Sequence, residues 1–144
     1  MVHSRDLLDL PGHVIRRLQQ QSAAVFQDRT KAAGFDVTSV QFAALSTLAT
    51  EPGLDQASLA KRIAYDRATI GGVVKRLAQK GWVVRMSDDA DRRAFKVTLT
   101  AEGTAALTEM TPIVHALQNE IIGGLSQEDQ GILLGLMKRA LKTD

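Results

Sequence analysis

The chain has 144 residues, 44% of them hydrophobic, and a formal net charge of +2 at neutral pH. This length fits one domain, or one domain with a helical extension. There is no cysteine, which excludes disulfides, thiolate zinc sites and cysteine-based redox sensing. No apolar run reaches the roughly 18 residues that a membrane span needs, and no secretory signal is visible, so we expect a cytoplasmic protein without a membrane partner.

The first 34 residues predict one long amphipathic helix after a short leader. Pro11 fits its first turn, and Gly34 is expected to end it. A narrow apolar stripe runs along this helix, and the leader holds three leucines among charges. Because such a stripe has to be buried against another element, we predict that residues 1–34 form an N-terminal dimerisation helix.

Residues 35–100 predict a winged helix-turn-helix DNA-binding domain. A capping-box pattern at residues 38–41 opens a supporting helix. Asp55 is the expected N-cap of the short helix that follows. Asp66 is expected to cap a further helix that begins at the next residue, and Gly81 is expected to end it.

The periodicity then changes to two. Apolar and polar side chains alternate over residues 82–86 and 95–99, and the loop 87–93 between them is too charged to be buried. This pattern predicts a two-stranded hairpin with a charged tip. A helix-turn-helix followed by such a hairpin lays its second helix in the DNA major groove. The predicted fold class is therefore mainly α with a small β-wing.

Residues 101–144 predict two C-terminal dimerisation helices. Thr100 is the expected cap of the first, which should kink at Pro112, and Ser126 is the expected cap of the second. Pairing these helices with a second copy would bury the apolar stripes at both ends of the chain. It would also place two reading helices about 34 Å apart, which matches an inverted-repeat operator. We therefore predict a homodimer.

The basic residues are concentrated in one block. Residues 61–96 hold ten of the 18 Lys and Arg and four of the 16 Asp and Glu, so this block carries +6 while the rest of the chain carries −4. The block coincides with the proposed reading elements, which favours double-stranded DNA as the partner over a merely solvated surface.

Four segments carry a family resemblance. Asp-Arg-Arg at residues 91–93, followed by Leu-Thr-Ala-Glu-Gly at residues 99–103, resembles the wing signature of the MarR family of transcriptional regulators. Segments 66–70 and 76–83 resemble the recognition helix and its exit in that family. The resemblance implies a triangular dimer joined by its terminal helices, with small aromatic carboxylates or phenols bound between those helices and the winged domain.

Two segments, one before the winged domain and one within it, refine this resemblance. Together, residues 10–13 and 66–74 resemble a MarR branch that represses the catabolism of aromatic acids, including nicotinate. A hydroxynicotinate-like or hydroxybenzoate-like effector is what this resemblance implies.

Candidate DNA contacts lie on the helix-turn-helix and on the wing. Arg93 at the wing tip is the best candidate for insertion into the minor groove. Asp91 is expected to shape the loop, whereas Arg92 and Lys96 are expected to contact phosphates. On the helix-turn-helix the candidates are Gln56, Ser58, Arg67, Ala68, Thr69, Gly71, Gly72, Lys75 and Arg76. Of these, Ser58 and Gln56 at the start of the earlier helix are expected to contact phosphate.

Gly71 and Gly72 are unusual inside a recognition helix, because each interior glycine costs about 1 kcal/mol relative to alanine. One interpretation is that the helix backbone approaches the DNA closely at this point. The other is tight packing against the neighbouring helix. The sequence leaves both interpretations open.

Candidate ligand-binding residues combine cations with apolar walls, which is what an aromatic acid requires. For His13, Arg16 and Arg17 the alternative is a solvated surface or a bridge between subunits. The candidates are His13, Arg16, Arg17, Phe42, Met110 and His115.

The favoured hypothesis is a homodimeric transcriptional repressor that a small aromatic acid releases from its operator. The alternative is a winged-helix architectural or protein-interaction module without an effector. The sequence has no Ser-His-Asp order, no Gly-rich phosphate loop after a strand and no metal-ligand spacing among its three histidines. We therefore expect no enzyme activity, no catalytic or metal site and no cofactor.

Overall fold

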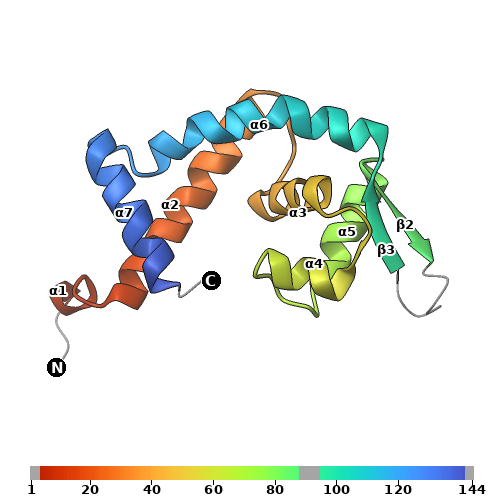
Figure 1. Cartoon of the computed structure of the whole chain (residues 1–144). Helices are drawn as coiled ribbons and strands as arrows, with labels where there is room; N and C mark the ends of the chain where they lie inside the picture. The colour runs from red at the N-terminus through yellow and green to blue at the C-terminus, as the bar shows by residue number, and fades with distance from the viewer. Residues whose placement is uncertain (1–3, 88–94, 142–144) are drawn as a thin grey trace.

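The computed structural model describes residues 4–87 and 95–141. Long helices from the two ends of the chain form one arm, and shorter helices with a small sheet form the other (Figure 1). This mainly α fold with a small β-wing confirms the predicted fold class. The elements are α1 (Ser4–Leu7), α2 (Pro11–Ala32), α3 (Ser39–Thr50), β1 (Leu54–Asp55), α4 (Gln56–Arg62), α5 (Ile70–Gln79), β2 (Val83–Ser87), β3 (Phe95–Leu99), α6 (Ala101–Ile121) and α7 (Gln127–Ala140).

Four of the described helices have an N-cap residue whose side chain caps the helix, as the sequence predicts. Each capping side chain accepts a hydrogen bond from a backbone N–H in the first turn of its helix, which satisfies a donor that the helix itself leaves free. At α3 the cap is a full capping box, because Gln41 also accepts a hydrogen bond from the N–H of the capping residue. The four caps are Thr38, Asp55, Thr100 and Ser126.

The start of α5 differs from the prediction. The expected first residue was Arg67, but the helix begins at Ile70 and residues 67–69 form a turn. Asp66 organises this turn, because its carboxylate accepts the Ala68 N–H at 3.0 Å. Such a side-chain bond to nearby backbone competes with helical pairing. The end of the helix is as predicted, with Gly81 in the left-handed region at φ 78°.

The sheet has three antiparallel strands in the order β1-β3-β2. The hairpin of β2 and β3 was expected, but β1 was not, because two residues show no periodicity. Val83 lies opposite Leu99 and Leu54 lies opposite Val97. Val83 and Val97 face the core, whereas the apolar Met86 is exposed on the wing.

The second arm is built around a core shared by α3, α4, α5 and the sheet (Figure 1). Leu45, Leu59, Leu77 and Val97, from these four elements, are each 0% exposed. Burial of a leucine side chain contributes about 1.5–3 kcal/mol. This core holds α5 against α4 and turns the opposite face of α5 outward.

Gly103, in the first turn of α6, lies against the backbone of Trp82, which follows the C-terminal end of α5. A Cβ at Gly103 would stand 2.0 Å from the carbonyl oxygen of Trp82. Thr100 makes two hydrogen bonds to the same turn. Its N–H donates to the Trp82 carbonyl oxygen at 3.0 Å, and its hydroxyl donates to the Gly81 carbonyl oxygen at 2.6 Å. Residues 99–103 therefore hold the residues that follow α5, and the wing, against the start of α6.

The long helices form the first arm. α2 packs along α6, and Arg29 pairs with Glu120 at 2.5 Å between them. α6 continues through Pro112 to Ile121. α7 lies beside the N-terminal half of α2 (Figure 1), and none of its described residues is buried. Among the described helices, none is long and apolar enough to cross a membrane.

Candidate DNA interface and ligand cavities

The exposed side of α5 is basic. Val74 and Leu77 point into the core, whereas Gly72, Lys75 and Arg76 are exposed. This split matches the helical periodicity of the sequence and leaves an accessible face with two cations. The turn before the helix exposes Arg67, Ala68 and Thr69.

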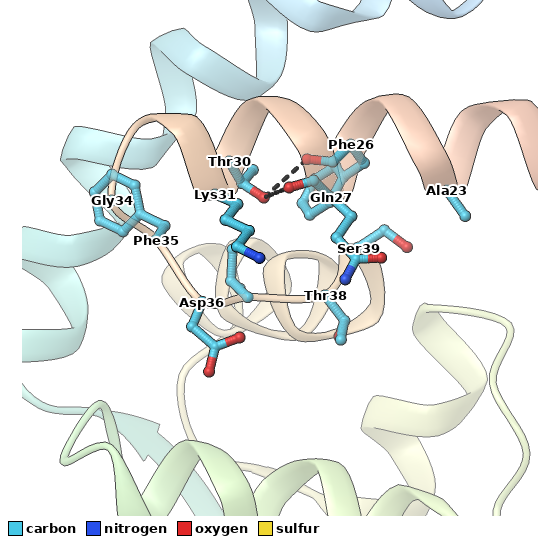
Figure 2. A pocket seen from close by; sticks show the side chains of 11 residues that line it. Ala23, Phe26, Gln27, Thr30, Lys31, Gly34, Phe35, Asp36, Thr38 and Ser39 are labelled. Carbon is cyan, nitrogen blue, oxygen red and sulfur yellow. Dashed lines mark hydrogen bonds between the residues drawn. The ribbon is translucent and has the colours of Figure 1, made fainter.

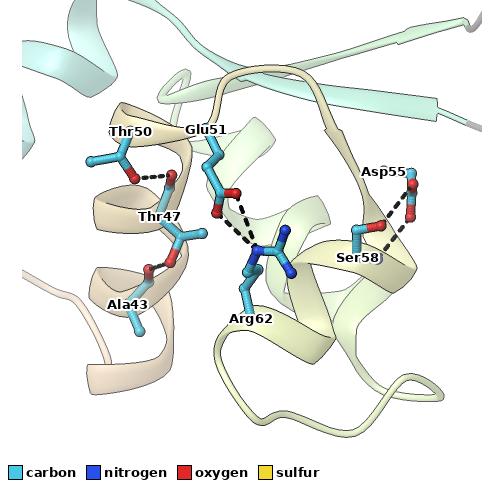
Figure 3. Close-up of polar contacts among 7 residues, drawn as sticks. All are labelled: Ala43, Thr47, Thr50, Glu51, Asp55, Ser58 and Arg62. Atoms are coloured by element: carbon cyan, nitrogen blue, oxygen red, sulfur yellow. Dashed lines mark hydrogen bonds and ion pairs between the residues drawn. The ribbon is translucent and has the colours of Figure 1, made fainter. Parts of the chain in front are cut away.

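The start of α4 borders this face. The Asp55 carboxylate accepts the Ser58 N–H at 2.7 Å and the Ser58 hydroxyl at 2.9 Å (Figure 3). The hydrogen bond from the Ser58 backbone keeps the pKa of the Asp55 carboxyl below its ordinary value. Ser58 was expected to contact phosphate, but here its only hydroxyl proton is used by Asp55. In this arrangement Ser58 stabilises the cap.

The structure separates the two interpretations of the paired glycines. A Cβ at Gly72 would have no atom within 4 Å outside its own helix, so packing does not exclude a side chain there. A Cβ at Gly71 would meet only the side-chain oxygen of Gln56, at 3.4 Å. Neither glycine is therefore required by the fold of the chain, and the interpretation as a close approach to DNA remains.

Only part of the predicted wing contact can be located. Lys96 is exposed on β3, opposite Met86 on β2. Arg85 is also exposed on β2 and was not among the candidates, although its place in an alternating strand next to a basic loop was a usable signal. The predicted contacts Asp91, Arg92 and Arg93 lie outside the described residues.

A shallow hollow of about 370 Å³ lies between α4 and the loop that leads from α4 to α5, and it adds a residue that the sequence did not single out. Tyr65 lines it together with Lys61 and Arg67. A phenol between two cations can donate a hydrogen bond to a phosphate oxygen. The sequence signal for Tyr65 was weak, because a lone aromatic residue between two helices is usually part of the core.

Arg62 has a structural role. Its Nε donates to both carboxylate oxygens of Glu51, at 3.0 and 3.2 Å (Figure 3). This hydrogen bonding raises the pKa of Arg62 above its ordinary value. The pair links the end of α4 to the end of α3, and both side chains are partly open to solvent. Arg62 is therefore already paired on the protein.

Three of the predicted ligand residues lie together near the start of α2. His13 is half-buried, and its Nδ1 lies 3.5 Å from the guanidinium of Arg16. Arg17 follows on the next position and is exposed. The three side chains thus form a small polar cluster on the first two turns.

The other three predicted ligand residues lie on α3 and α6. Phe42 packs on Phe26 of α2, with ring centroids 6.3 Å apart. Phe26 is 13 residues beyond His13, which corresponds to about 20 Å along a helix. Met110 is 0% exposed in the core, and His115 is exposed on α6. Within one protomer the six candidates do not converge on one site.

A cavity of about 490 Å³ lies between the second half of α2 and the start of α3 (Figure 2). It combines the aromatic rings of Phe26 and Phe35 with the ammonium group of Lys31 and with polar side chains from the beginning of α3. This mixture suits a small aromatic acid. The lining residues are Ala23, Phe26, Gln27, Thr30, Lys31, Gly34, Phe35, Asp36, Val37, Thr38 and Ser39.

A second cavity of about 670 Å³ lies among α2, α6 and α7 and is more apolar. Leu18, Ile121, Leu133 and Met137 contribute to its walls. It continues the exposed apolar surface of α7 rather than forming a closed chamber. None of the six predicted ligand residues lines either cavity.

Lys80 connects the first cavity to the reading helix. This residue follows α5, and its ammonium group donates to the carbonyl oxygen of Asp36, whose carboxylate lies 4.0 Å away. The same ammonium group lies 5.0 Å from the ring centroid of Trp82, a cation–π distance. Asp36 borders the cavity, so one side chain joins the cavity rim to the end of α5.

A helix-turn-helix with a basic exposed face, followed by a wing and framed by long helices, defines a winged-helix DNA-binding protein. Residues 37–95 match the MarR family model. The HTH-type transcriptional repressor NicR of Pseudomonas putida is 33% identical over 139 residues, covering 96% of this chain and 87% of NicR. The chain therefore belongs to the MarR family of transcriptional regulators.

Solved structures agree with this assignment. BpsR of Bordetella bronchiseptica, whose DNA binding is regulated by 6-hydroxynicotinic acid, is 29% identical with a TM-score of 0.85, and the match covers 100% of this chain and 99% of BpsR. PcaV of Streptomyces coelicolor, solved in complex with its natural ligand, is 31% identical with a TM-score of 0.85, covering 99% of each chain. These likenesses also support the aromatic-acid branch of the family.

Proposed function

We propose that the protein is a homodimeric transcriptional repressor that binds an inverted-repeat operator and is released from it by a small aromatic carboxylate. The observation that carries this proposal is the cavity with an ammonium group and two aromatic rings, whose rim Lys80 joins to the end of α5. The names of similar proteins support it, since NicR is a repressor and BpsR is regulated by 6-hydroxynicotinic acid.

Release from DNA requires that the ligand prefer one arrangement of the reading helices. A ligand shifts an equilibrium only by the difference between its affinities for the two states. A carboxylate bound beside Asp36 would compete with the oxygens of Asp36 for the ammonium group of Lys80, and it would thereby favour a different position of α5. The expected consequence is a lower affinity for the operator in the presence of the acid.

The first prediction is that hydroxylated benzoates or nicotinates release the protein from its operator. Fluorescence anisotropy of labelled operator, titrated with a panel of such acids, measures the release. The operator for this titration is the duplex that the purified protein selects from genomic fragments. If no acid in the panel shifts the titration curve, release by these acids is contradicted and the alternative, a winged-helix module without an effector, is favoured.

Two variants distinguish the candidate places for the acid. One place is the polar cluster at the start of α2, where His13 and Arg17 lie one turn apart and can share a carboxylate. If the acid binds there, His13→Ala should blunt the response to the acid while leaving DNA affinity nearly unchanged. Lys31→Ala is the matched variant for the cavity between α2 and α3. The proposal based on the cavity expects a response that is lost in Lys31→Ala and retained in His13→Ala, and the opposite result would place the acid at the start of α2.

The second prediction concerns the wing. We expect Arg93→Ala to weaken operator binding by about 1–3 kcal/mol, the cost of losing one specific DNA contact. Arg62→Ala is the matched control, because Arg62 is already paired with Glu51. Binding isotherms at one salt concentration compare the two. Equal affinities for both variants would contradict the assignment of Arg93.

A further inference from the structure

Gln56, the first residue of α4, lies against α5 at Gly71. Its side-chain oxygen lies 3.4 Å from the point where a Cβ at Gly71 would stand. The side chain is half-exposed. Among residues 4–87 and 95–141 its amide has no hydrogen-bond partner, whereas the neighbouring Asp55 and Ser58 satisfy each other. An amide with free donors and acceptors thus occupies the space of the missing side chain at position 71.

This amide has the chemistry to recognise a base pair. A glutamine side chain offers two N–H donors and an acceptor oxygen, and in the major groove it can pair with both N6 and N7 of adenine. α5 is the helix that winged-helix proteins place in that groove. At Gly71 itself, α5 has no side chain to reach the base edges.

We propose that Gln56 reads an A·T base pair in the major groove through the opening at Gly71. A residue of α4 then supplies the base contact that α5 lacks at this position. This inference rests on the proposed binding of an operator by the winged domain. It differs from a phosphate contact, which would lower the affinity for every DNA sequence equally.

Selection from a randomised duplex pool tests the inference. The full-length protein, Gln56→Ala and the control Gln79→Ala are each used to select sequences. Gln79 is exposed at the last position of α5, so its substitution removes the same amide elsewhere on the reading unit. We expect the parent and Gln79→Ala to share one A·T preference that Gln56→Ala loses. Gln56→Ala should also bind the parental sequence about 5- to 100-fold more weakly.

A double-mutant cycle with Gly71→Ala tests the geometry. The added methyl group would stand in van der Waals contact with the side-chain oxygen of Gln56, at 3.4 Å, and would narrow the opening at position 71, so Gly71→Ala should weaken the preference for that same base pair. In the Gln56→Ala background it should have no further effect on the preference, because coupled residues are not additive.

The outcomes separate this inference from the proposed function. Identical base preferences in the parent and Gln56→Ala, or an equal loss of affinity for all sequences, would overturn the role of Gln56 and leave the operator-binding function intact. A parent that selects no sequence at all would overturn the proposed function together with the inference.

Discussion

Replacing Gly103 with alanine is expected to lower the free energy of unfolding by about 3 kcal/mol, the upper end of the usual cost of overpacking. The added Cβ would stand 2.0 Å from the carbonyl oxygen and 2.8 Å from the carbonyl carbon of Trp82. These are backbone atoms in the exit from α5, so they cannot rotate away. α6 would have to shift, which would strain the two hydrogen bonds from Thr100 to this turn.

Gly72→Ala is the matched control for that substitution. Both glycines are in helices, but a Cβ at Gly72 would meet nothing within 4 Å. Alanine there should raise the free energy of unfolding by up to about 1 kcal/mol, because it restricts the unfolded chain and favours the helix. Urea unfolding at one protein concentration, followed by far-ultraviolet circular dichroism, measures both changes. If Gly103→Ala were as stable as the parent, the close approach of α6 to Trp82 would be refuted.

The sequence predicts local features of this fold but not contacts between residues that are far apart in the chain. Local signals were sufficient for the helix caps, because a capping side chain and its N–H partner are two or three residues apart. Thr38 and Asp55 are therefore where the pattern placed them. The contact of Gly103 with Trp82 joins residues 21 positions apart in the sequence, and no local pattern reveals such a contact.

The candidate sites also divide into those that a local pattern predicts and those that depend on how the helices pack. The exposed basic face of α5 was predictable, because helical periodicity separates Lys75 and Arg76 from the buried Val74 and Leu77. The ligand residues depended on how α2, α3 and α6 are placed relative to one another. Composition made Met110 a plausible apolar wall, yet the packing of α6 buries it completely.

The start of α5 could not be predicted correctly from the sequence. Asp66 has the chemistry of an N-cap, and the side chain does accept a backbone N–H. The bond goes to Ala68, two residues on, which produces a turn before the helix begins. Two glycines immediately after Ile70 weaken the local preference for helix, and nothing in the residue types distinguishes an early start from a late one.

Substituting Leu136 with glutamate is expected to convert the protein from a dimer into a monomer. Leu136 and Ile132 lie one turn apart on α7, and they are 52% and 54% exposed in the single chain. An exposed apolar face of this kind favours pairing with a second copy. A carboxylate in the middle of that surface would have to lose its water without gaining a partner, which costs several kcal/mol.

Light scattering at micromolar concentration measures the first part of this prediction. The parent should have twice the chain mass of 15.6 kDa, and Leu136→Glu should have the mass of one chain. Lys138→Glu is the matched control, because it also places a carboxylate on α7 but about 160° away around the helix. It should remain a dimer. A parent of 15.6 kDa, or a dimeric Leu136→Glu, would contradict the assignment of this face.

The loss of the dimer should also appear in DNA binding. Two linked reading units engage two half-sites, and the second contact then benefits from a high effective concentration. A monomer loses this advantage, so Leu136→Glu should bind the inverted-repeat operator at least about 100-fold more weakly. Its affinity for a duplex that holds a single half-site should be close to that of the parent, because α5 and the wing are unchanged. Equal losses on both duplexes would mean that the substitution acts through the reading unit itself.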